Sequence, residues 1–270
     1  KKFNCLLKLD VSFYGQQSLR EFDLKSFNIE NTLASYSESI KLGAPLNFKN
    51  KLIRKLKLSS LLFPNYIEEK NSFAYDQRIE LINKPIYLDG YWQNLNYFES
   101  YREDLSLLFT PKAEMSEQYL EYLTQIHSTQ SVSIHVRRGD YVNDFYTQSI
   151  HDVCNLDYYI KAIKYIESKV DNPTYFIFSD DMGWCEKNLD FLSNKFFIYK
   201  THSALEDFQL MRNCQSNIMS NSTFSWWASW LPGDRGDTLD SQVVLPSRWL
   251  KNRLTQNLNL DFNRSMVLEE

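Results

Sequence analysis

The sequence predicts an α/β protein whose second half forms a parallel sheet of the doubly wound kind. Short strand-like apolar runs alternate there with segments whose apolar residues recur at helical spacing. Such alternation is typical of consecutive β–α–β units. Because ligands of these sheets bind at the carboxyl ends of the strands, side chains that directly follow a strand are the first candidates for a functional site.

The second half of the chain contains the clearer elements. Its helices carry apolar side chains along one side, as at Ile160, Ile163 and Ile166 or at Leu205 and Phe208. Its strands are short runs rich in β-branched and aromatic residues. We predict strands at 132–136, 174–179, 196–199, 217–220 and 243–245, and helices at 157–170, at 205–214 and in the Trp-rich segment after residue 220.

The first half is less regular. Strands are predicted at 5–11 and 85–88 and a helix at 116–127, with helical and irregular chain between 30 and 80. The chain has 270 residues, of which 43% are hydrophobic. That length and composition are sufficient for two compact units of ordinary size.

Composition excludes several classes of protein. The formal net charge of -4 argues against a strongly basic nucleic-acid-binding protein, so an anionic ligand must be held by local charge. No apolar run is long enough to span a membrane. The four cysteines lack the spacing of zinc ligands, and we expect reduced thiols in a cytoplasmic protein. They are Cys5, Cys154, Cys185 and Cys214.

The segment SVSIHVRRGDY carries the most informative pattern. Strand alternation places its β-branched residues on one face and Ser133, His135 and Arg137 on the other. Continuing that parity would place Arg138 on the apolar face, where an unpaired charge is not tolerated. We therefore expect the strand to end near Arg137 and residues 138–140 to form a loop.

The adjacent arginines have two interpretations. Guanidinium groups bind phosphate oxygens through paired hydrogen bonds, so Arg137 and Arg138 at a strand end would suit a diphosphate. They could equally form a structural pair that bridges Asp and Glu side chains. Spacing alone does not decide between these interpretations.

A second cluster of polar and aromatic residues lies further along the chain. A predicted helix and strand lead into the segment NSTFSWW, in which Ser222 or Thr223 suits the N-cap of another helix. The free N–H groups at a helix N-terminus attract anions and could hold a phosphate. Alternatively, the segment is only a cap followed by an aromatic core helix that contains Trp226, Trp227 and Trp230.

Asp180 and Asp181 follow a predicted strand and have three interpretations. They could bind a metal, abstract a proton or cap the next helix. No two aspartates have the Asp-x-Asp spacing with which many sugar transferases hold a metal-bound diphosphate. If arginines neutralise the diphosphate, no metal is required, and we expect no metal or other cofactor.

A basic stretch in the first half also has two interpretations. It could form an amphipathic helix that contacts an anionic membrane surface, or a helix with an ordinary solvated face. Its residues are Lys49, Lys51, Arg54, Lys55 and Lys57.

Two motifs resemble those of a known family. HVRRGDY, which begins at His135, resembles the first motif of the α-1,2-fucosyltransferases, and the segment from Asp207 to Trp230 is similar to their second motif. The tripeptides that begin at Phe27 and Tyr91 resemble further landmarks. The resemblance extends from about residue 8 to about residue 250 and, because the motifs occur in the family's order, it is specific.

This resemblance implies a GT-B-like fold, with two Rossmann-like domains that face each other across a cleft. It implies an acceptor-side domain at 1–130 and a GDP-fucose-binding domain at 131–270. The implied reaction transfers L-fucose from GDP-fucose to the 2-hydroxyl of a terminal galactose, with inversion and without metal. A bacterial surface glycan such as O-antigen is the implied acceptor.

The resemblance also implies roles for individual residues. Arg137 and Arg138 would contact the diphosphate and stabilise the leaving GDP. Asp140 is our candidate for the catalytic base, with Asp144 and His151 as weaker candidates. The remaining donor-binding residues would contact the guanosine, ribose and phosphates, and they are His135, Asp207, Asn221, Ser222, Thr223 and Phe224.

One departure from the family pattern affects the expected activity. Family members usually begin with a Gly-rich strand–loop element, and this chain starts just after the place where it should lie. We expect that element to complete the catalytic apparatus. The alternatives are a non-catalytic protein that binds a nucleotide sugar or glycan, and a fucosyltransferase of other linkage.

Overall fold

The computed structural model divides the chain into two compact units. The first unit comprises residues 1–100 and 108–112, and the second comprises the rest. The observed division therefore differs from the predicted one after residue 130, because α5 (Glu117–Ser128) belongs to the second unit. The residues that the structure describes are 6–16, 22–29, 32–151, 153–199, 203–234, 236, 240–258, 260, 262 and 265–269.

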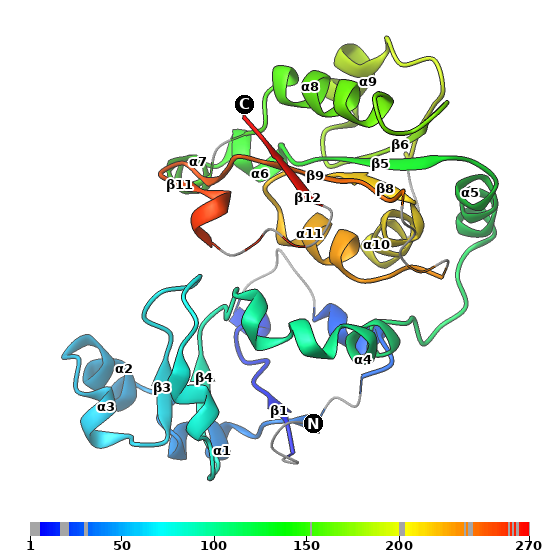
Figure 1. Cartoon of the computed structure of the whole chain (residues 1–270). Helices are drawn as coiled ribbons and strands as arrows, with labels where there is room; N and C mark the ends of the chain where they lie inside the picture. The colour runs from blue at the N-terminus through cyan, green and yellow to red at the C-terminus, as the bar shows by residue number, and fades with distance from the viewer. Residues whose placement is uncertain are drawn as a thin grey trace. The chain divides into compact units, whose positions relative to one another are not determined.

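A parallel six-stranded sheet forms the centre of the second unit (Figure 1). The strand order is β12-β9-β8-β5-β6-β7, and every neighbouring pair runs parallel. Read from β7, this is the 3-2-1-4-5-6 order of a Rossmann-like sheet, and the direction of strand addition reverses between β5 and β8. The strands are β5 (Ser131–Val136), β6 (Thr174–Ser179), β7 (Lys195–Phe197), β8 (Ser216–Ile218), β9 (Val243–Pro246) and β12 (Ser265–Leu268).

Helices cover both faces of this sheet, with α8 and α9 on one face and α10 and α11 on the other (Figure 1). A short antiparallel pair, β10 (Arg248–Leu250) and β11 (Arg253–Leu254), follows β9 and leads into a 3₁₀ turn at Thr255–Leu258. The remaining helices are α4 (Arg102–Leu108), α6 (Gly139–Asn143), α7 (Phe145–Ile150), α8 (Leu156–Glu167), α9 (Met182–Leu189), α10 (Ala204–Asn213) and α11 (Thr223–Trp230).

β5 is buried along its whole length because both of its faces are covered. Its three β-branched residues belong to the core cluster that also contains the apolar side chains of α8. Ser133 and His135 face the layer of α10 and α11: Ser133 Oγ accepts a hydrogen bond from Asn217 Nδ2 (2.7 Å), and the His135 ring lies 5.8 Å from that of Phe224. The predicted alternation of faces is thereby confirmed.

The predicted elements of the second unit are found within a few residues of their expected positions. The prediction of a loop at 138–140 is wrong, however, because Gly139 begins the short helix α6.

Side chains cap several helices: Ser116 accepts from the N–H of Tyr119 in α5, and Asn155 accepts from the N–H of Tyr158 in α8.

α4, which belongs to the second unit except for Leu108, is held there by buried and half-buried polar contacts. Arg102 Nε donates to the carbonyl of Trp230 at 2.6 Å. Arg212 donates to the carbonyls of Pro232 (2.7 Å) and Ser106 (3.0 Å). Burial lowers the pKa of the Arg212 guanidinium, and these carbonyls supply the hydrogen bonds that a buried charge needs.

The first unit contains two separate parallel strand pairs. One pair joins β1 (Lys8–Leu9) to β2 (Thr32–Leu33), and the other joins β3 (Tyr66–Glu68) to β4 (Tyr87–Asp89). The strand predicted at 5–11 is shorter than expected, and Cys5 lies outside the described residues. The helices are α1 (Tyr36–Lys41), α2 (Phe48–Lys55), α3 (Ser59–Leu62) and the 3₁₀ helices Tyr14–Gln16, Asp23–Ser26, Gln77–Leu81, Leu95–Tyr97 and Glu99–Tyr101.

Cys154, Cys185 and Cys214 are buried. Of the helices that the structure describes, none combines the length and the apolar composition that crossing a bilayer requires.

Tyr158 connects α8 to the strands on which the second unit is built. Its fully buried hydroxyl donates to the carbonyls of Met219 (2.6 Å) and Val244 (3.3 Å). We expect Tyr158→Phe to lower the free energy of unfolding by about 1–3 kcal/mol, because a buried carbonyl loses a donor. Tyr165→Phe is the matched control, since its half-buried hydroxyl bonds only a side-chain oxygen of Gln242 (3.1 Å). Equal effects of the two changes in urea unfolding would contradict the expectation.

Candidate functional site

The polar residues that follow β5, β6 and β8 meet at the carboxyl edge of the sheet. Val136, the last residue of β5, pairs with Ser179, the last residue of β6. The next residues, Arg137 and Asp180, therefore come side by side. The turn after β8 lies on the other side of β5, where strand order reverses. In open α/β sheets this reversal point is where ligands bind.

Arg137 is held between two aspartates. Its Nη2 lies 2.7 Å from Asp140 Oδ1 and its Nη1 lies 3.0 Å from Asp180 Oδ2. The guanidinium also lies over the Tyr141 ring, 5.8 Å from its centre. Its side chain is 28% exposed, so it is fixed in position while part of it remains accessible.

Arg138 is held in a similar way. Its Nε lies 3.1 Å from Asp181 Oδ2, and its guanidinium lies 4.7 Å from the centre of the Trp184 ring. Its backbone N–H donates to Asp180 Oδ1 at 2.8 Å. The two adjacent arginines therefore share Asp180, one through its side chain and the other through its backbone.

The aspartates that follow β6 cap the next helix and form ion pairs with the arginines. Asp181 accepts a hydrogen bond from the N–H of Trp184 and caps α9, as predicted. Asp180 approaches the start of α6 so closely that a Cβ on Gly139 would lie 2.8 Å from Asp180 Oδ2. Glycine at 139 is what permits this ion-paired arrangement. The described part of the chain contains no group of three or more His, Cys, Asp or Glu side chains placed to hold a metal ion.

The arginine pair is thus neutralised within the protein, because two guanidinium groups face three carboxylates. Structural bridging, one of the two predicted interpretations, is observed. It does not exclude anion binding, because each guanidinium has five N–H donors. The contacts above use two nitrogens of the Arg137 side chain and one of the Arg138 side chain.

His135 is a buried, uncharged ring next to the arginines. Its Nδ1 lies 2.8 Å from Ser220 Oγ, and its carbonyl accepts from the hydroxyl of Tyr159 (3.1 Å). Burial, assisted by the charge of Arg137, lowers the pKa of His135 to about 4. The ring is therefore uncharged at neutral pH, and it can donate one hydrogen bond and accept another without adding charge to the site.

The turn before α11 separates into a buried and an accessible part. Asn221 is 1% exposed: its Nδ2 donates to the carbonyl of Trp249 (3.2 Å), and its carbonyl accepts from Tyr141 Oη (3.1 Å). Ser222 occupies the predicted N-cap position without capping through its side chain. Thr223, at the start of α11, is exposed. The accessible N-terminus of α11 thus lies after β8, next to β5.

Aromatic rings connect α10 to this turn. Phe224 lies 5.7 Å from Phe208 of α10, and Phe208 follows Asp207 in the first turn of that helix. Asp207 is half-buried. The structure thereby brings the second predicted motif to the same edge of the sheet as the arginine pair.

The three candidate proton acceptors differ in their surroundings. Asp140 is ion-paired with Arg137, and its side chain is 36% exposed. Asp144 caps α7, and hydrogen bonds from Thr147 lower the pKa of its carboxyl, which makes it a weaker base. His151 stacks on Tyr141 with ring centres 4.6 Å apart, and burial lowers the pKa of its ring.

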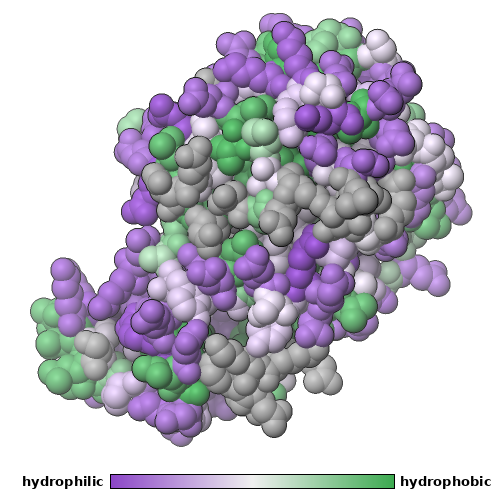
Figure 2. All heavy atoms as spheres, in the orientation of Figure 1, coloured by the Kyte–Doolittle hydropathy of each residue, from purple (hydrophilic) through white to green (hydrophobic). Residues whose placement is uncertain are grey.

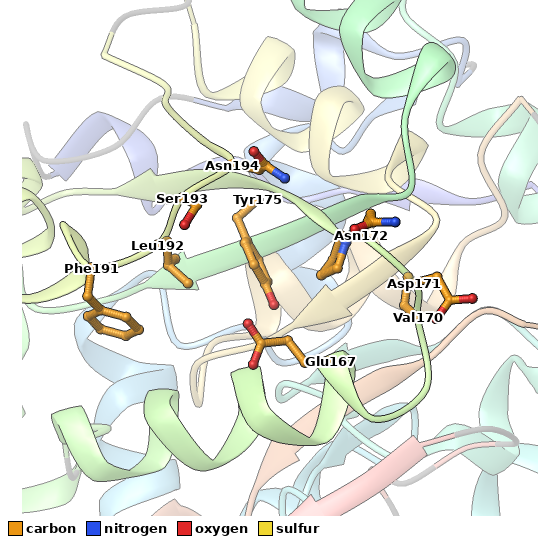
Figure 3. A pocket seen from close by; sticks show the side chains of 10 residues that line it. Glu167, Val170, Asp171, Asn172, Tyr175, Phe191, Leu192, Ser193 and Asn194 are labelled. Carbon is orange, nitrogen blue, oxygen red and sulfur yellow. The ribbon is translucent and has the colours of Figure 1, made fainter.

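A separate pocket opens at the opposite edge of the sheet (Figure 3). It has a volume of about 340 Å³ and surrounds Tyr175, whose ring points toward Glu167 of α8. Tyr175 lies near the start of β6, whereas the arginine partners follow its end. This pocket is therefore remote from the charged cluster.

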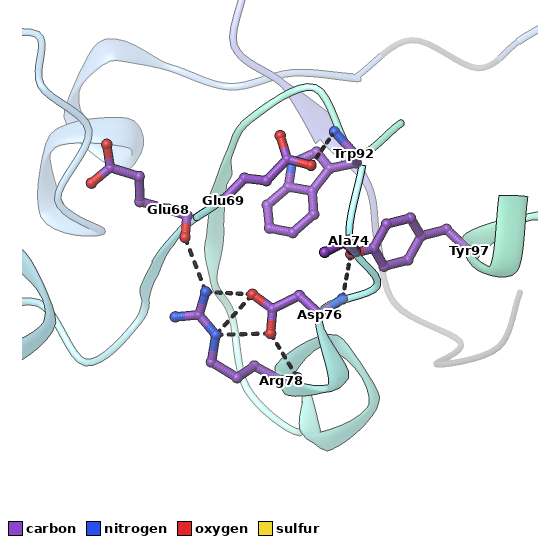
Figure 4. A network of polar contacts seen from close by, with 7 residues as sticks. All are labelled: Glu68, Glu69, Ala74, Asp76, Arg78, Trp92 and Tyr97. Atoms are coloured by element: carbon purple, nitrogen blue, oxygen red, sulfur yellow. Dashed lines mark hydrogen bonds and ion pairs between the residues drawn. The ribbon is translucent and has the colours of Figure 1, made fainter. Parts of the chain in front are cut away.

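The first unit has its own polar network, at the carboxyl ends of β3 and β4 (Figure 4). The Glu69 carboxylate accepts hydrogen bonds from the backbone N–H groups of Tyr91 (2.7 Å) and Trp92 (2.9 Å). Trp92 has a φ of 52°, which is unfavourable for a bulky residue. A Cβ on Gly90 would lie 2.3 Å from that of Glu69, so the turn also requires glycine.

Further contacts hold this turn in place. Tyr97 stands edge-on to Trp92 with ring centres 5.9 Å apart, and its hydroxyl accepts from the N–H of Asp76 (2.7 Å). Asp76 is ion-paired with Arg78, which also donates to the carbonyl of Glu68 at 3.0 Å (Figure 4). Sequence reasoning identified Tyr91 and Trp92 only as family landmarks and missed Glu69, which nothing local connects to them.

The depressed pKa of His135 predicts a pH-dependent stability. The unfolded chain binds a proton near pH 6.5, whereas the folded ring binds one only near pH 4. Stability should therefore fall as the pH falls from 6.5 to 4, by at most roughly 3 kcal/mol from this group. Urea unfolding across that range should show a smaller loss in His135→Gln than in the wild type. His127→Gln, at an exposed histidine, is the control and should not differ from the wild type.

Comparison with known proteins places the chain in a family. Residues 19–257 match the model described as Glycosyl transferase family 11. An α-1,2-colitosyltransferase of Escherichia coli is 33% identical, over 92% of this chain and 83% of that protein. The O-antigen biosynthesis glycosyltransferase WbnK of Escherichia coli is 28% identical, over 94% of this chain and 88% of that protein. The galactoside 2-α-L-fucosyltransferase SEC1 of Bos taurus is 26% identical, over 60% of this chain and 46% of that protein. The family match confirms the resemblance seen in the two motifs: the chain belongs to glycosyltransferase family 11.

Proposed function

We propose that this enzyme transfers L-fucose from GDP-fucose to the 2-hydroxyl of a terminal galactose, with inversion at the anomeric carbon. The observation that carries the proposal is the position of Arg137 and Arg138 at the point where the strand order of the sheet reverses. The names of relatives, an α-1,2-colitosyltransferase and a galactoside 2-α-L-fucosyltransferase, support the linkage and the acceptor.

The proposed role of the arginine pair is to bind the diphosphate and stabilise its growing charge. The leaving GDP becomes more negative as the glycosidic bond breaks. Arg137 and Arg138 are already oriented by their aspartates, so little reorganisation is needed when that charge develops. The free N–H groups at the start of α11, at Thr223 and Phe224, would hold a second side of the phosphates, with Ser222 beside them.

The guanosine would lie beside the aromatic residues of the same edge. The neutral His135 ring lies 5.8 Å from the Phe224 ring, which lies 5.7 Å from Phe208, the neighbour of the half-buried Asp207 in α10. These residues would bind one nucleoside. Asn221, whose amide is already bonded within the protein, would shape the turn and need not touch the donor. We propose Asp140 as the proton acceptor, because its carboxylate is partly exposed beside Arg137. No step of this scheme uses a metal.

The first unit would bind the acceptor, in a GT-B-like arrangement of two domains. Its support lies within that unit: a turn fixed by Glu69 presents Tyr91, whose side chain is 80% exposed. Aromatic side chains on rigid turns offer an apolar face on which a sugar ring can stack. A hollow of about 340 Å³ adjoins the turn and is lined by Glu69, Asp76 and Arg78, among others. These groups would bind the sugar hydroxyls.

Replacement of Arg138 tests the donor site. We expect Arg138→Ala to lower kcat about a hundredfold or more, since removing one donor to a developing negative charge raises the barrier by about 3 kcal/mol. Arg138→Lys should recover only part of the rate, because an ammonium group lacks the planar fork. Lys164→Ala, at an exposed position of α8, is the control and should be as active as the wild type.

Calorimetry and product analysis complete this test. GDP should bind more tightly than GMP or UDP in the presence of a chelator, and Arg138→Ala should weaken GDP binding. GDP-fucose and GDP-colitose should be compared as donors, because relatives act with both sugars by name. Failure to bind GDP would refute the proposal. GDP binding without transfer or hydrolysis would favour a non-catalytic binding protein, and near-normal transfer by Asp140→Asn would refute only its assignment as the base.

Replacement of Tyr91 tests the acceptor side separately. We expect Tyr91→Ala to raise the acceptor KM about tenfold, while slow hydrolysis of GDP-fucose without acceptor stays unchanged. Glu69→Gln should act in the same direction, because the glutamine amide has only one acceptor oxygen and its NH2 group would face the second backbone N–H. Tyr36→Ala changes an exposed tyrosine of the same unit and is the control. An unchanged acceptor KM in Tyr91→Ala would remove Tyr91 from the acceptor site.

A further inference from the structure

α2 exposes its apolar side and buries a polar one. Phe48, Leu52 and Leu56 recur every fourth residue and are 82%, 43% and 58% exposed. Asn50, on the opposite side, is only 3% exposed. A surface helix of a globular protein normally has the reverse arrangement, with its apolar stripe toward the core.

Specific polar contacts fix α2 in this orientation. Asn50 Nδ2 donates to the carbonyls of Ile40 (3.2 Å) and Ala44 (2.9 Å), so its burial is satisfied. On the same side of the helix, one turn further on, Arg54 donates to Glu68 Oε1 through Nε (3.0 Å) and Nη2 (2.7 Å). Rotating the helix to bury its leucines would break these bonds. The exposed stripe is therefore built into the unit.

α3 continues the same surface. Leu61 and Leu62 are 76% and 52% exposed, whereas Ser59 is 9% exposed. Together with Phe48, Leu52 and Leu56 of α2, these two leucines form what we call the apolar patch. In Figure 2 hydrophobic atoms gather at the lower left, where α2 and α3 lie in Figure 1.

Positive charge surrounds the apolar patch. Residues 48–62 contain five basic residues and no acidic one. Arg54 is ion-paired with Glu68, and the lysines at 49, 51, 55 and 57 are exposed. Apolar and cationic side chains alternate along α2 and the residues after it, and α3 adds two exposed leucines. This is the composition of a segment that lies in the interface of an anionic bilayer.

We propose that α2 and α3 form a docking surface for an anionic lipid bilayer. The apolar patch would enter the boundary between headgroups and acyl chains, while the lysines contact the headgroup phosphates. The helices have eight and four residues, so they would lie along the surface. A basic side chain near such a surface strengthens binding about fivefold, and the effect weakens as salt screens it.

The charge pattern favours a bilayer over a second copy of the chain. In a two-fold symmetric dimer the same patch would face itself, which would bring lysines of one copy toward lysines of the other. Like charges in such an interface are unfavourable. An anionic bilayer instead complements every lysine and accepts the apolar side chains without requiring a matching shape.

Vesicle co-sedimentation tests the proposal. The wild-type chain should bind vesicles of phosphatidylcholine mixed with phosphatidylglycerol, and bind vesicles of phosphatidylcholine alone at least tenfold more weakly. The double change Phe48→Ser and Leu61→Ser should weaken binding to the mixed vesicles at least tenfold, because two large apolar side chains no longer enter the bilayer. Lys49→Glu with Lys51→Glu should weaken binding similarly, and high salt should reduce binding of the wild type.

A matched control separates the patch from exposed apolar side chains in general. Leu81→Ser changes a leucine that is 79% exposed elsewhere in the same unit, and it should bind as the wild type does. Circular dichroism and Tm would verify that the double variant is folded. The proposal is overturned if the wild type does not bind the mixed vesicles or if the folded double variant binds them equally well. A dimer in light scattering that Leu61→Ser dissociates would also overturn it, since a second copy would then cover the patch.

Discussion

The ion-paired cluster at the ends of β5 and β6 is the interaction on which the second unit depends most. Register brings Arg137 beside Asp180, and the two strands end together there. The same aspartates determine how the following helices begin, because Asp181 caps α9 and Asp180 packs against Gly139 of α6. Strand ends, helix starts and the candidate site are thus determined by one set of charges.

Because of this cluster, an anion that binds to the arginines must compete with the carboxylates that already contact them. With three carboxylates around two guanidiniums, the site has no excess positive charge before a ligand arrives. A diphosphate must therefore use the remaining N–H donors or replace a carboxylate. The aspartates hold each arginine in one orientation, and the cost of ordering these long side chains is met during folding. Affinity would then depend on geometry more than on net charge.

Local patterns predicted the elements of the second unit, and long-range pairing determined the rest. The alternation within β5 was sufficient to place His135 and Arg137 on one face. It could not show that Asp180 would neutralise the arginine, because that contact depends on which strand becomes the neighbour of β5. Similarly, the basic and apolar residues of α2 left two interpretations open. The burial of Asn50, which depends on carbonyls up to ten residues away, determines which side faces outward.

The contacts of α4 mean that neither unit is one continuous stretch of chain. Arg102 and Ser106 are bonded to the segment around Trp230 and Arg212, yet residues 108–112, directly after them, belong to the first unit. The backbone therefore crosses between the units after residues 100, 107 and 112. During synthesis the first unit can be completed only after α4 has emerged, and α4 finds its partners only after the segment from Arg212 to Pro232 has been made. During translation α4 therefore lacks the residues to which it bonds in the folded protein, because they lie more than a hundred positions downstream.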